Sequence, residues 1–332
     1  MSNPIFSIIV PIYCGGQYID ALIDTAARQG LASEEYELIF VNDCSPDDTA
    51  AVIQSRIDNR ITPPHLTLIN HTVNKRQGGA RNTGMRIAKG EYIVFIDQDD
   101  SFADGALAKV RDYIMANSGL DIVMVDFENV NSRLIRKELF NNSHDAMSGS
   151  KFIQTQQIPW SPWCYIYRRE FLIGNNIIFE DKVRFEDTDF VIKSTIMANL
   201  ISYVPIILVK HLNWDGQTSH MGSDYNRIYD YFKMSGRIRA IGENILTDDP
   251  ATAKAVMGHH HFMHKANIQR YLWRLPFKQK LQILRECRAY IPSSDRMLSF
   301  SSRHPLAFAC ILQAAKPILP LVRSMYLKVK KK

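Results

Sequence analysis

Tyr92-Ile93-Val94-Phe95-Ile96-Asp97-Gln98-Asp99-Asp100 is the stretch that decides the fold of this chain. Its first five residues are aliphatic or aromatic, which is typical of a strand buried on both faces of a mostly parallel sheet. Three carboxylates follow within four positions and repel one another unless a cation or strong donors lie among them. Ligands bind at this end of the strands in open α/β sheets, so the stretch predicts a hard divalent metal carrying phosphate. For the motif alone, the alternative is a solvated acidic turn that caps the next helix.

Strand and helix patterns alternate around this stretch. Strand-like segments cover residues 6–13, 37–41 and 66–69, and helical patterns follow at residues 19–26, from Pro46 with Ser45 as N-cap, and at residues 77–89. Four strand–helix alternations in about a hundred residues predict a parallel α/β sheet built from βαβ units. In such a sheet the polar or glycine-rich segments after the strands meet at one edge, which is therefore the predicted site.

Composition limits the class of protein. With 332 residues, one large domain and an appendage are expected. The chain is 46% hydrophobic and 22% charged, which excludes wholesale disorder. Its five cysteines are scattered without a C-x-x-C pair, so we expect a reducing compartment and neither a disulfide framework nor a structural zinc site. No signal-peptide pattern precedes the first strand.

Three further segments carry side chains suited to chemistry. Lys75 to Gly84 is glycine-rich and basic at the start of a helix, where backbone N–H groups favour a diphosphate; a glycine turn with solvated bases is the alternative. Pro159 to Arg169 contains two tryptophans and two tyrosines that suit a sugar-stacking wall or a core strand. Glu186 and Asp187 begin a helical pattern, where acidic residues are favourable even without a function.

The order and spacing of these segments, from residue 5 to about residue 220, resemble the family 2 glycosyltransferases with a GT-A fold. The resemblance implies a Rossmann-like, mostly parallel sheet flanked by helices. It also implies that Asp43 holds the donor base, that Asp99 is the main metal ligand and that Asp97 lies near the ribose or the metal. The other donor-binding residues that it implies are Pro11, Tyr13, Gly79, Arg81 and Gln98.

The same resemblance assigns the acceptor side. Asp187 corresponds to the catalytic base, and Glu186 and Trp163 lie near the acceptor or the sugar. The sequence departs from the family pattern at Cys14 and Gly16, where Asn and Glu are common. The late tyrosine-rich segment is replaced by residues 211–219, in which His211 could approach the metal or serve as a structural histidine.

The implied activity is transfer of a sugar, with inversion, from a nucleotide-diphosphate donor, and the resemblance implies that this donor is UDP-linked. Mg²⁺ or Mn²⁺ is the implied cofactor, and a glycan or lipid-linked acceptor in surface-polysaccharide synthesis is the implied partner. Two other classes remain open from the residues themselves: a sugar-phosphate nucleotidyltransferase and a non-catalytic membrane-binding protein. No nucleic-acid partner is expected, because the aromatic and basic residues after Tyr271 fit an amphipathic helix.

We expect a catalytic domain over residues 1–220 and a helical region over residues 221–304. His260 and His264 lie one helical turn apart, but no nearby Asp, Glu or Cys completes a zinc site. Residues 305–332 mix apolar residues with Lys and Arg, which predicts a basic amphipathic tail on an anionic membrane. This tail predicts a cytoplasmic protein that is peripheral on the inner face of the cell membrane. The alternative is a helix that packs on its own catalytic domain and has a frayed basic end.

Overall fold

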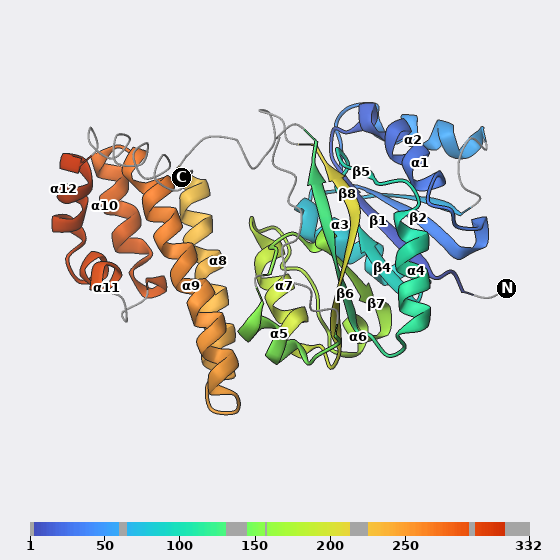
Figure 1. The fold of residues 1–332 in the computed structure, drawn as a ribbon. Helices are drawn as coiled ribbons and strands as arrows, with labels where there is room; N and C mark the ends of the chain where they lie inside the picture. The colour runs from blue at the N-terminus through green and yellow to red at the C-terminus, as the bar shows by residue number, and fades with distance from the viewer. Residues whose placement is uncertain are drawn as a thin grey trace. The chain divides into compact units, whose positions relative to one another are not determined.

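The structure is a computed structural model that describes residues 3–59, 65–130, 145–156, 158–212, 225–291 and 296–315. The chain divides into two compact units, Met1–His220 and Met221–Lys332. The described part of the first unit contains a sheet with helices, and that of the second consists of helices and their connections (Figure 1). Residues 213–219, the departure from the family pattern that follows Leu212, lie outside the described residues.

Strands and helices alternate through the first unit, as the sequence predicts for its first hundred residues. The strands are β1 (Phe6–Ile12), β2 (Tyr36–Asn42), β3 (Leu66–Asn70), β4 (Tyr92–Phe95), β5 (Ser101–Phe102), β6 (Ile122–Asn129), β7 (Tyr165–Arg168) and β8 (Ile201–His211). The helices are α1 (Ile19–Ala27), α2 (Thr49–Asp58), α3 (Arg76–Ile87), α4 (Ala106–Ala116), α5 (Gly149–Thr155), α6 (Arg169–Gly174) and α7 (Glu186–Met197).

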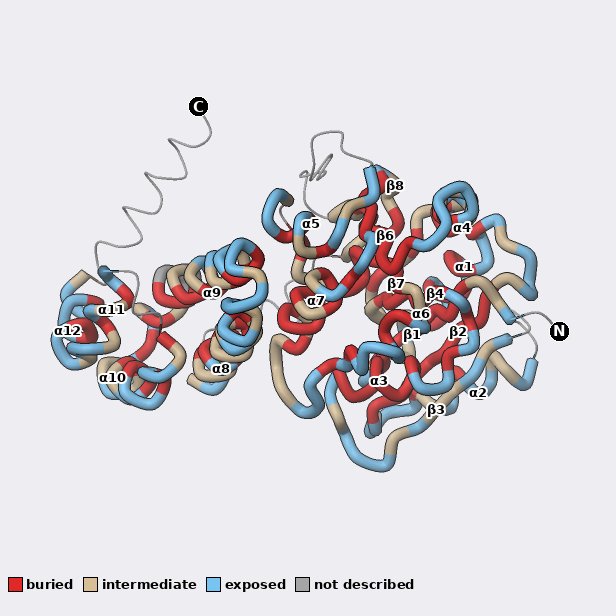
Figure 2. Tube along the Cα trace, turned by 90° about the horizontal axis from the view of Figure 1, so that it is seen from below, coloured by how far each residue is buried: buried red, intermediate tan, exposed pale blue. Residues whose placement is uncertain are grey.

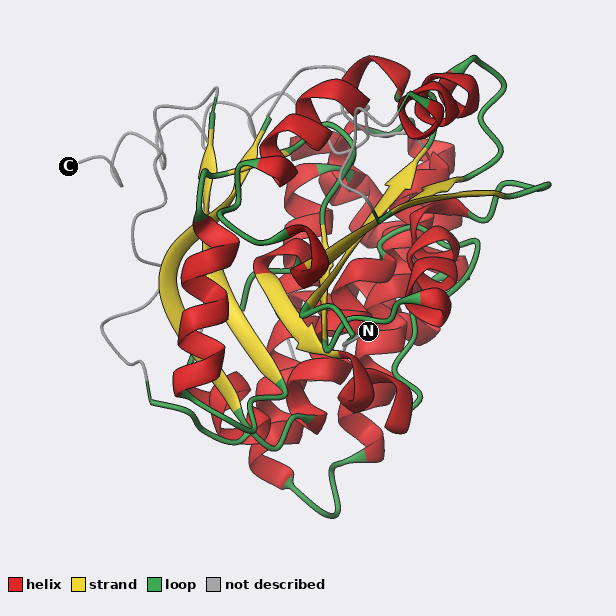
Figure 3. Cartoon of the chain, turned by 90° about the vertical axis from the view of Figure 1, so that its right-hand side faces the viewer, coloured by secondary structure: helices red, strands yellow, loops and turns green. Residues whose placement is uncertain are grey.

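The strands form one mixed sheet in the order β3-β2-β1-β4-β7-β6-β8-β5. β1 pairs in parallel with β2 and β4, and β2 pairs in parallel with β3, which confirms the predicted arrangement of the first four strands. β7 runs antiparallel to both β4 and β6. Figure 3 shows the strands turning against one another across the sheet, the twist that L-amino acids impose on extended chains. Since β1 to β4 are parallel, their carboxyl ends lie at one edge.

One helix begins later than the sequence predicts. The pattern places a helix start at Pro46 with Ser45 as N-cap, whereas α2 begins at Thr49. The Ser45 hydroxyl instead accepts the Cys14 N–H at 3.0 Å, and the Thr49 hydroxyl accepts the next two backbone N–H groups of the same loop, both at 3.1 Å. The segment after β2 therefore fixes the loop after β1 before it turns into a helix.

The core of the first unit is formed by strands that are buried on both faces. All seven residues of β1 and all seven of β2 are buried, and Figure 2 shows buried residues concentrated on the strands and the inner sides of the helices. At the end of β4, the ring of Phe95 packs edge-on against Tyr167, Phe179 and Phe190 with centroid distances of 5.3 to 6.0 Å. This cluster confirms the core-strand alternative for Tyr165 to Tyr167, and it draws the start of α7 toward the end of β4.

The second unit is built from helices around their own hydrophobic core. The helices are α8 (Tyr225–Asn244), α9 (Pro250–Arg270), α10 (Phe277–Glu286), α11 (Arg296–Arg303) and α12 (Pro305–Ala315). Ile228 and Phe232 of α8 share this core with Leu284 of α10, Leu298 of α11 and Phe308 of α12. No helix in the described parts of the chain combines the length and the apolar run needed to cross a bilayer.

The predicted tail is divided between described and undescribed residues. Residues 305–315 form α12, and Phe308, Ala309 and Leu312 of this helix are buried in the core of the second unit. This part of the predicted tail packs on the helices of the second unit, which the alternative of packing on the catalytic domain did not include. Residues 316–332 lie outside the described residues.

Candidate active site

The carboxyl edge of the sheet brings the predicted site residues together. Tyr13 follows β1, Asp43 follows β2 and Asp97 lies just after β4. The backbone around this edge is strained, because several non-glycine residues have the left-handed conformation, which costs roughly 1–3 kcal/mol each and persists where the surroundings impose it. These residues are Cys14 (φ 49°), Cys44 (φ 62°), Arg76 (φ 64°) and Phe185 (φ 62°).

Arg81 of α3 joins the two acidic clusters of the sequence. One guanidinium nitrogen, Nη2, donates to Asp97 Oδ1 at 2.8 Å, and the other, Nη1, donates to Asp187 Oδ1 at 2.5 Å and lies 3.5 Å from Glu186 Oε1. The Arg81 side chain has no exposed surface. The sequence predicts that Arg81 lies beside a diphosphate. In the structure, the buried Arg81 guanidinium holds these three carboxylates together.

The loop before α7 covers Arg81 and is fastened to α3. The Asn82 side chain accepts the Phe179 N–H at 2.9 Å, donates to the Phe179 carbonyl at 2.8 Å and donates to Asp181 at 2.9 Å. The Phe179 ring lies over the guanidinium, 5.2 Å from Arg81 Cζ. Gly78 permits this contact, since a Cβ atom there would lie 2.9 Å from the Glu180 carbonyl oxygen. The helix α3 thus positions both Arg81 and the segment that leads to Glu186.

Glu186 and Asp187 are neighbours with different surroundings. The Glu186 side chain is 7% exposed, and burial together with the charge of Asp187 raises the pKa of its carboxyl to about 8. The Asp187 side chain is 31% exposed. Partial burial raises the pKa of its carboxyl to about 6, while Arg81 acts in the opposite direction. Asp187 is therefore the carboxylate of this pair that reaches the surface and is ionised at neutral pH.

The three carboxylates after β4 are also distinct from one another. Asp100 is buried and accepts His211 Nδ1–H at 2.8 Å and the Leu212 N–H at 3.0 Å. Burial raises the pKa of the Asp100 carboxyl to about 6, against the effect of its bond with His211. Burial acts to lower the pKa of His211, but the hydrogen bond with Asp100 and the charges of the carboxylates after β4 together outweigh it, and the pKa is raised. Asp100 therefore anchors β8 to the end of β4.

Asp97 and Asp99 carry the oxygen atoms that a hard divalent cation prefers as ligands. Asp97 Oδ2 accepts no hydrogen bond from a described residue, because only Oδ1 is bound by Arg81. Among the described residues no group of three or more His, Cys, Asp or Glu side chains is placed to hold a metal ion. Mg²⁺ bound with a nucleotide commonly takes only one or two carboxylates, and phosphate oxygens and water complete its shell. The hard oxygen donors after β4 suit that arrangement.

Trp163 lies inside the site and not on its surface. Its side chain stacks on the His211 ring at a centroid distance of 5.2 Å and meets the Phe127 ring edge-on at 4.8 Å, and the residue is only 5% exposed. In this geometry Trp163 supports His211, and an acceptor would meet little of the indole.

The remaining residues predicted for the donor side lie on β1, after β1, after β4 and in the first turn of α3. The Gln98 side-chain amide accepts the Tyr13 N–H at 2.8 Å and donates to the Tyr13 carbonyl at 3.1 Å, while the Tyr13 residue is 48% exposed. Pro11 is a buried residue of β1 that pairs with Val41. Gly79 is buried, and a Cβ atom there would lie 2.4 Å from Lys75 Cβ, so glycine is needed for the turn that opens α3.

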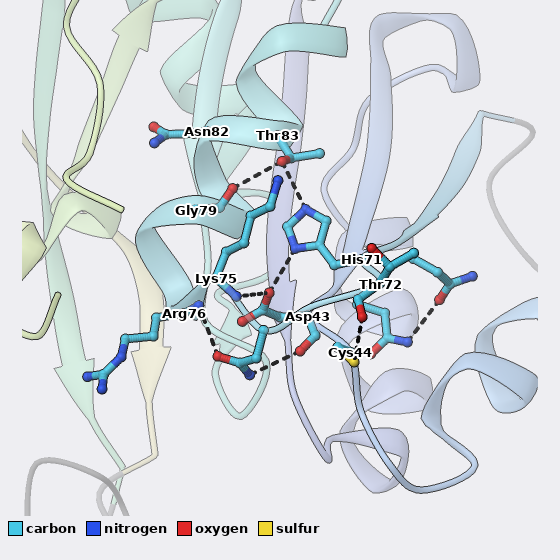
Figure 4. A network of polar contacts seen from close by, with 12 residues as sticks. Asp43, Cys44, His71, Thr72, Lys75, Arg76, Gly79, Asn82 and Thr83 are labelled. Carbon is cyan, nitrogen blue, oxygen red and sulfur yellow. Dashed lines mark hydrogen bonds and ion pairs between the residues drawn. The ribbon is translucent and has the colours of Figure 1, made fainter. Parts of the chain in front are cut away.

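His71 was missed by sequence reasoning. It follows β3, and its ring bonds both Asp43, at 2.7 Å, and Thr83 of α3, at 2.9 Å (Figure 4). The position of His71 in the sequence could have indicated its role. It is a polar residue that directly follows a parallel strand at the edge where Asp43 and Asp97 also lie. Asn82 was missed for another reason: its partners are about a hundred residues away in the chain.

Comparisons with known proteins found a matching family model and similar glycosyltransferases. The family model described as glycosyl transferase family 2 matches residues 7–178. The poly(ribitol-phosphate) beta-N-acetylglucosaminyltransferase TarS of Staphylococcus aureus is 28% identical over 247 residues, which cover 74% of this chain and 41% of TarS. The uncharacterized glycosyltransferase EpsJ of Bacillus subtilis is 31% identical over 203 residues, which cover 56% of this chain and 55% of EpsJ. The chain thus spans about half or less of the length of these two relatives.

Two solved structures share the fold. A crystal structure of S. aureus TarS 1–349 in complex with UDP-GlcNAc aligns with a TM-score of 0.76 at 21% identity and covers 93% of this chain and 90% of that one. The mannosyltransferase PcManGT from Pyrobaculum calidifontis, in complex with GDP-Man and Mn²⁺, aligns with a TM-score of 0.56 at 17% identity and covers 97% of this chain and 88% of that one. At these identities the likeness supports the GT-A fold and nothing finer.

Proposed function

Because the chain belongs to glycosyl transferase family 2, we propose that it moves a sugar with inversion from a UDP-linked donor to a glycan or lipid-linked acceptor. The observation that carries this proposal is the pair of hydrogen bonds by which the Arg81 guanidinium holds Asp187 beside Asp97 of the donor side. Family membership also separates this reading from a nucleotidyltransferase and from a non-catalytic binding protein. Surface-polysaccharide synthesis is the proposed setting, since TarS is named for acting on poly(ribitol-phosphate).

Asp187 is the proposed base. An acceptor hydroxyl becomes a nucleophile when a carboxylate within hydrogen-bond reach takes its proton. Asp187 suits this role better than Glu186 because its side chain is 31% exposed, against 7% for Glu186. Its raised pKa, about 6, makes it a stronger base than an ordinary Asp while it stays ionised at pH 7. Arg81 fixes the direction of this carboxylate.

The donor is proposed to lie along the carboxyl edge. Asp43 receives the base, Gly79 and the N-terminal turn of α3 face the diphosphate, and Asp97 and Asp99 hold Mg²⁺ or Mn²⁺. When bound, such an ion neutralises the charge that develops on the departing diphosphate. The UDP-GlcNAc complex of TarS supports the choice of UDP for this chain, and the Mn²⁺ complex of PcManGT supports the choice of metal.

Substitution of Asp187 tests the proposal. UDP release from UDP-GlcNAc and UDP-glucose should need Mn²⁺ or Mg²⁺, and Asp187→Asn should lower turnover by about 10²–10⁴. Binding of UDP, measured by thermal shift with Mn²⁺, should be nearly unchanged in Asp187→Asn and weakened in Asp99→Ala. Full turnover in Asp187→Asn would show that the base is a different residue.

We further propose that the second unit rests on an anionic membrane surface. Leu306 and Ile311 of α12 are apolar side chains that are 53% and 52% exposed. Residues 316–332 contain six Lys or Arg and no Asp or Glu. Apolar area beside positive charge is the combination that binds anionic bilayers, with roughly 1 kcal/mol for each base near the surface.

Vesicle sedimentation tests this membrane contact. The protein should sediment with vesicles that contain phosphatidylglycerol and remain in solution with phosphatidylcholine alone. Ile311→Glu should weaken sedimentation because it places a charge on the exposed side of α12. Equal sedimentation with both kinds of vesicle, or none with either, would contradict the proposal.

A further inference from the structure

One oxygen of the Asp43 carboxylate is already saturated. Asp43 Oδ1 accepts His71 Nδ1–H at 2.7 Å and the Lys75 backbone N–H at 2.8 Å (Figure 4). A carboxylate oxygen has two lone-pair sites, so these two donors fill Oδ1. The other oxygen, Oδ2, accepts no hydrogen bond from a described residue, and the Asp43 side chain is 5% exposed. Asp43 therefore offers a single acceptor to a ligand.

His71 is held in this position from both ends. Its Nε2 lies 2.9 Å from the Thr83 hydroxyl, and its side chain is 6% exposed. The Thr83 hydroxyl is in turn fixed on α3 by the Gly79 carbonyl at 3.1 Å and by the Arg86 guanidinium at 2.7 Å. Because an ionised carboxylate can only accept, Nδ1 is the protonated nitrogen toward Asp43. If the ring turned away from the carboxylate, both contacts would break.

The second donor to Oδ1 is fixed by the chain around it. The Asn74 side chain donates to the Asp43 carbonyl at 3.0 Å and accepts the Arg76 N–H at 3.1 Å. Lys75 lies between these two anchored residues, so its N–H stays on Oδ1. These contacts leave Oδ2 as the one oxygen of the Asp43 carboxylate that accepts no hydrogen bond from a described residue.

We propose that His71 determines base specificity by occupying Asp43 Oδ1, so that the site accepts uracil and rejects guanine. The inference rests on the proposed function, in which Asp43 receives the base of the donor. Uracil presents one N–H, at N3, between two carbonyl groups, and one carboxylate oxygen satisfies it. Guanine presents two adjacent donors, at N1 and N2, which need both oxygens of a carboxylate. A donor left unpaired in a buried site lowers affinity more than a matched hydrogen bond raises it.

The fold alone leaves this choice open. TarS is solved with UDP-GlcNAc and PcManGT with GDP-Man, and both share the fold of this chain. The fold therefore does not fix the base, and among the described contacts of Asp43 the ring of His71 is the one side chain that bonds its carboxylate.

The test compares UDP and GDP binding in three forms of the full chain. Isothermal titration calorimetry with Mn²⁺ gives the affinities for the unaltered chain, His71→Ala and His71→Asn. The unaltered chain should prefer UDP. His71→Ala should lose about tenfold in UDP affinity, and its preference should fall toward equality because Oδ1 becomes open to the second guanine donor. His71→Asn should keep most of the preference, because its amide N–H replaces Nδ1–H.

Each outcome of the calorimetry bears on either the role of His71 or the proposed function. An unchanged UDP-to-GDP ratio in His71→Ala, or a ratio in His71→Asn as low as in His71→Ala, would overturn the role of His71. A preference of the unaltered chain for GDP would do the same. Folded, unaltered protein that binds neither nucleotide would instead overturn the proposed function itself. If His71→Ala does not fold, Thr83→Val keeps the ring and removes its anchor; the ratio should then fall partly, and no fall would count against positioning.

Discussion

At the scale of single residues, Arg81 organises the charges of the site. Its guanidinium serves three carboxylates, which leaves an excess of negative charge if all of them are ionised. The raised pKa of Glu186, about 8, removes one of these charges at neutral pH. The buried Arg81 guanidinium then lies between the carboxylates of Asp97 and Asp187, and the Glu186 carboxyl beside it is neutral. A buried ion pair of this kind fixes the direction of the Asp187 carboxylate more than it stabilises the fold.

The pH dependence of turnover follows from Asp187. Its pKa is raised from 3.8 to about 6, and a carboxyl acts as a base only when deprotonated. We therefore expect kcat/KM to be constant near pH 7 and to fall about tenfold per pH unit below pH 6. The measurement is a pH–rate profile with saturating metal. Glu186→Gln serves as the control, which should keep an acid limb; a profile that stays flat down to pH 5 would exclude Asp187 as the titrating base.

At the scale of elements, the position of α7 decides where the base lies. α7 begins at Glu186 and is packed against α5, whose Gly149 N–H donates to the Ala198 carbonyl at 2.9 Å. A Cβ atom on Gly149 would lie 1.6 Å from the Thr195 carbonyl oxygen, which no side chain could tolerate. The close approach of these two helices therefore requires glycine at this position.

Gly149→Ala should push α5 and α7 apart. Overpacking of this kind costs roughly 1–3 kcal/mol, and we expect a lower thermal midpoint together with reduced turnover, since α7 carries Asp187. Gly174→Ala is the matched control, because nothing lies within 4 Å of a Cβ atom at Gly174. It should leave both quantities nearly unchanged. Equal effects of the two substitutions would show that the α5–α7 contact does not position the base.

At the scale of the whole molecule, the two units differ in their buried polar groups. The first unit buries carboxylates around a cation, whereas the second buries two histidines on α9. His260 Nε2 lies 3.0 Å from the Tyr290 carbonyl, and His264 Nδ1 bonds the Ser235 hydroxyl. The other ring nitrogens, His260 Nδ1 and His264 Nε2, have no partner among the described residues. These rings are accommodated as neutral groups.

Acid should therefore destabilise the second unit. Burial lowers the pKa of His260 from 6.5 to about 4 and that of His264 well below 6.5. Between these values the unfolded chain binds protons that the folded chain does not, so stability is lost as the pH falls below 6.5. His260 alone should cost roughly 2 kcal/mol at pH 5 relative to pH 7. Urea denaturation followed by circular dichroism at both pH values measures this loss.

A matched variant separates this effect from general acid sensitivity. His260→Gln keeps an N–H for the Tyr290 carbonyl and does not titrate, so its loss of stability between pH 7 and pH 5 should be smaller. If the unaltered chain and His260→Gln lose the same stability, the buried histidine is not the cause.

The sequence by itself determined the features that depend on neighbouring residues or on a periodic pattern of side chains. Runs of buried aliphatic residues specified the parallel strands, and the polar residues that follow them specified the edge where the site lies. The positions of Asp43, Asp97 and Glu186–Asp187 were predicted in this way, because a residue after a parallel strand or at the start of a helix has a predictable place, whereas their roles were implied by the family resemblance. The resemblance to family 2 glycosyltransferases rested on the same ordered segments.

The tertiary structure decided which of these groups meet. Along the chain, Arg81 is 16 residues from Asp97 and 106 residues from Asp187. Nothing in this spacing indicates that one guanidinium bonds both carboxylates. The occupation of Asp43 Oδ1 by His71, 28 residues away, is equally invisible in the sequence. Burial and hydrogen-bond saturation depend on what the rest of the chain places around a group. Side-chain type and periodicity fix where a residue can lie, and only the packed fold fixes its partners and its charge.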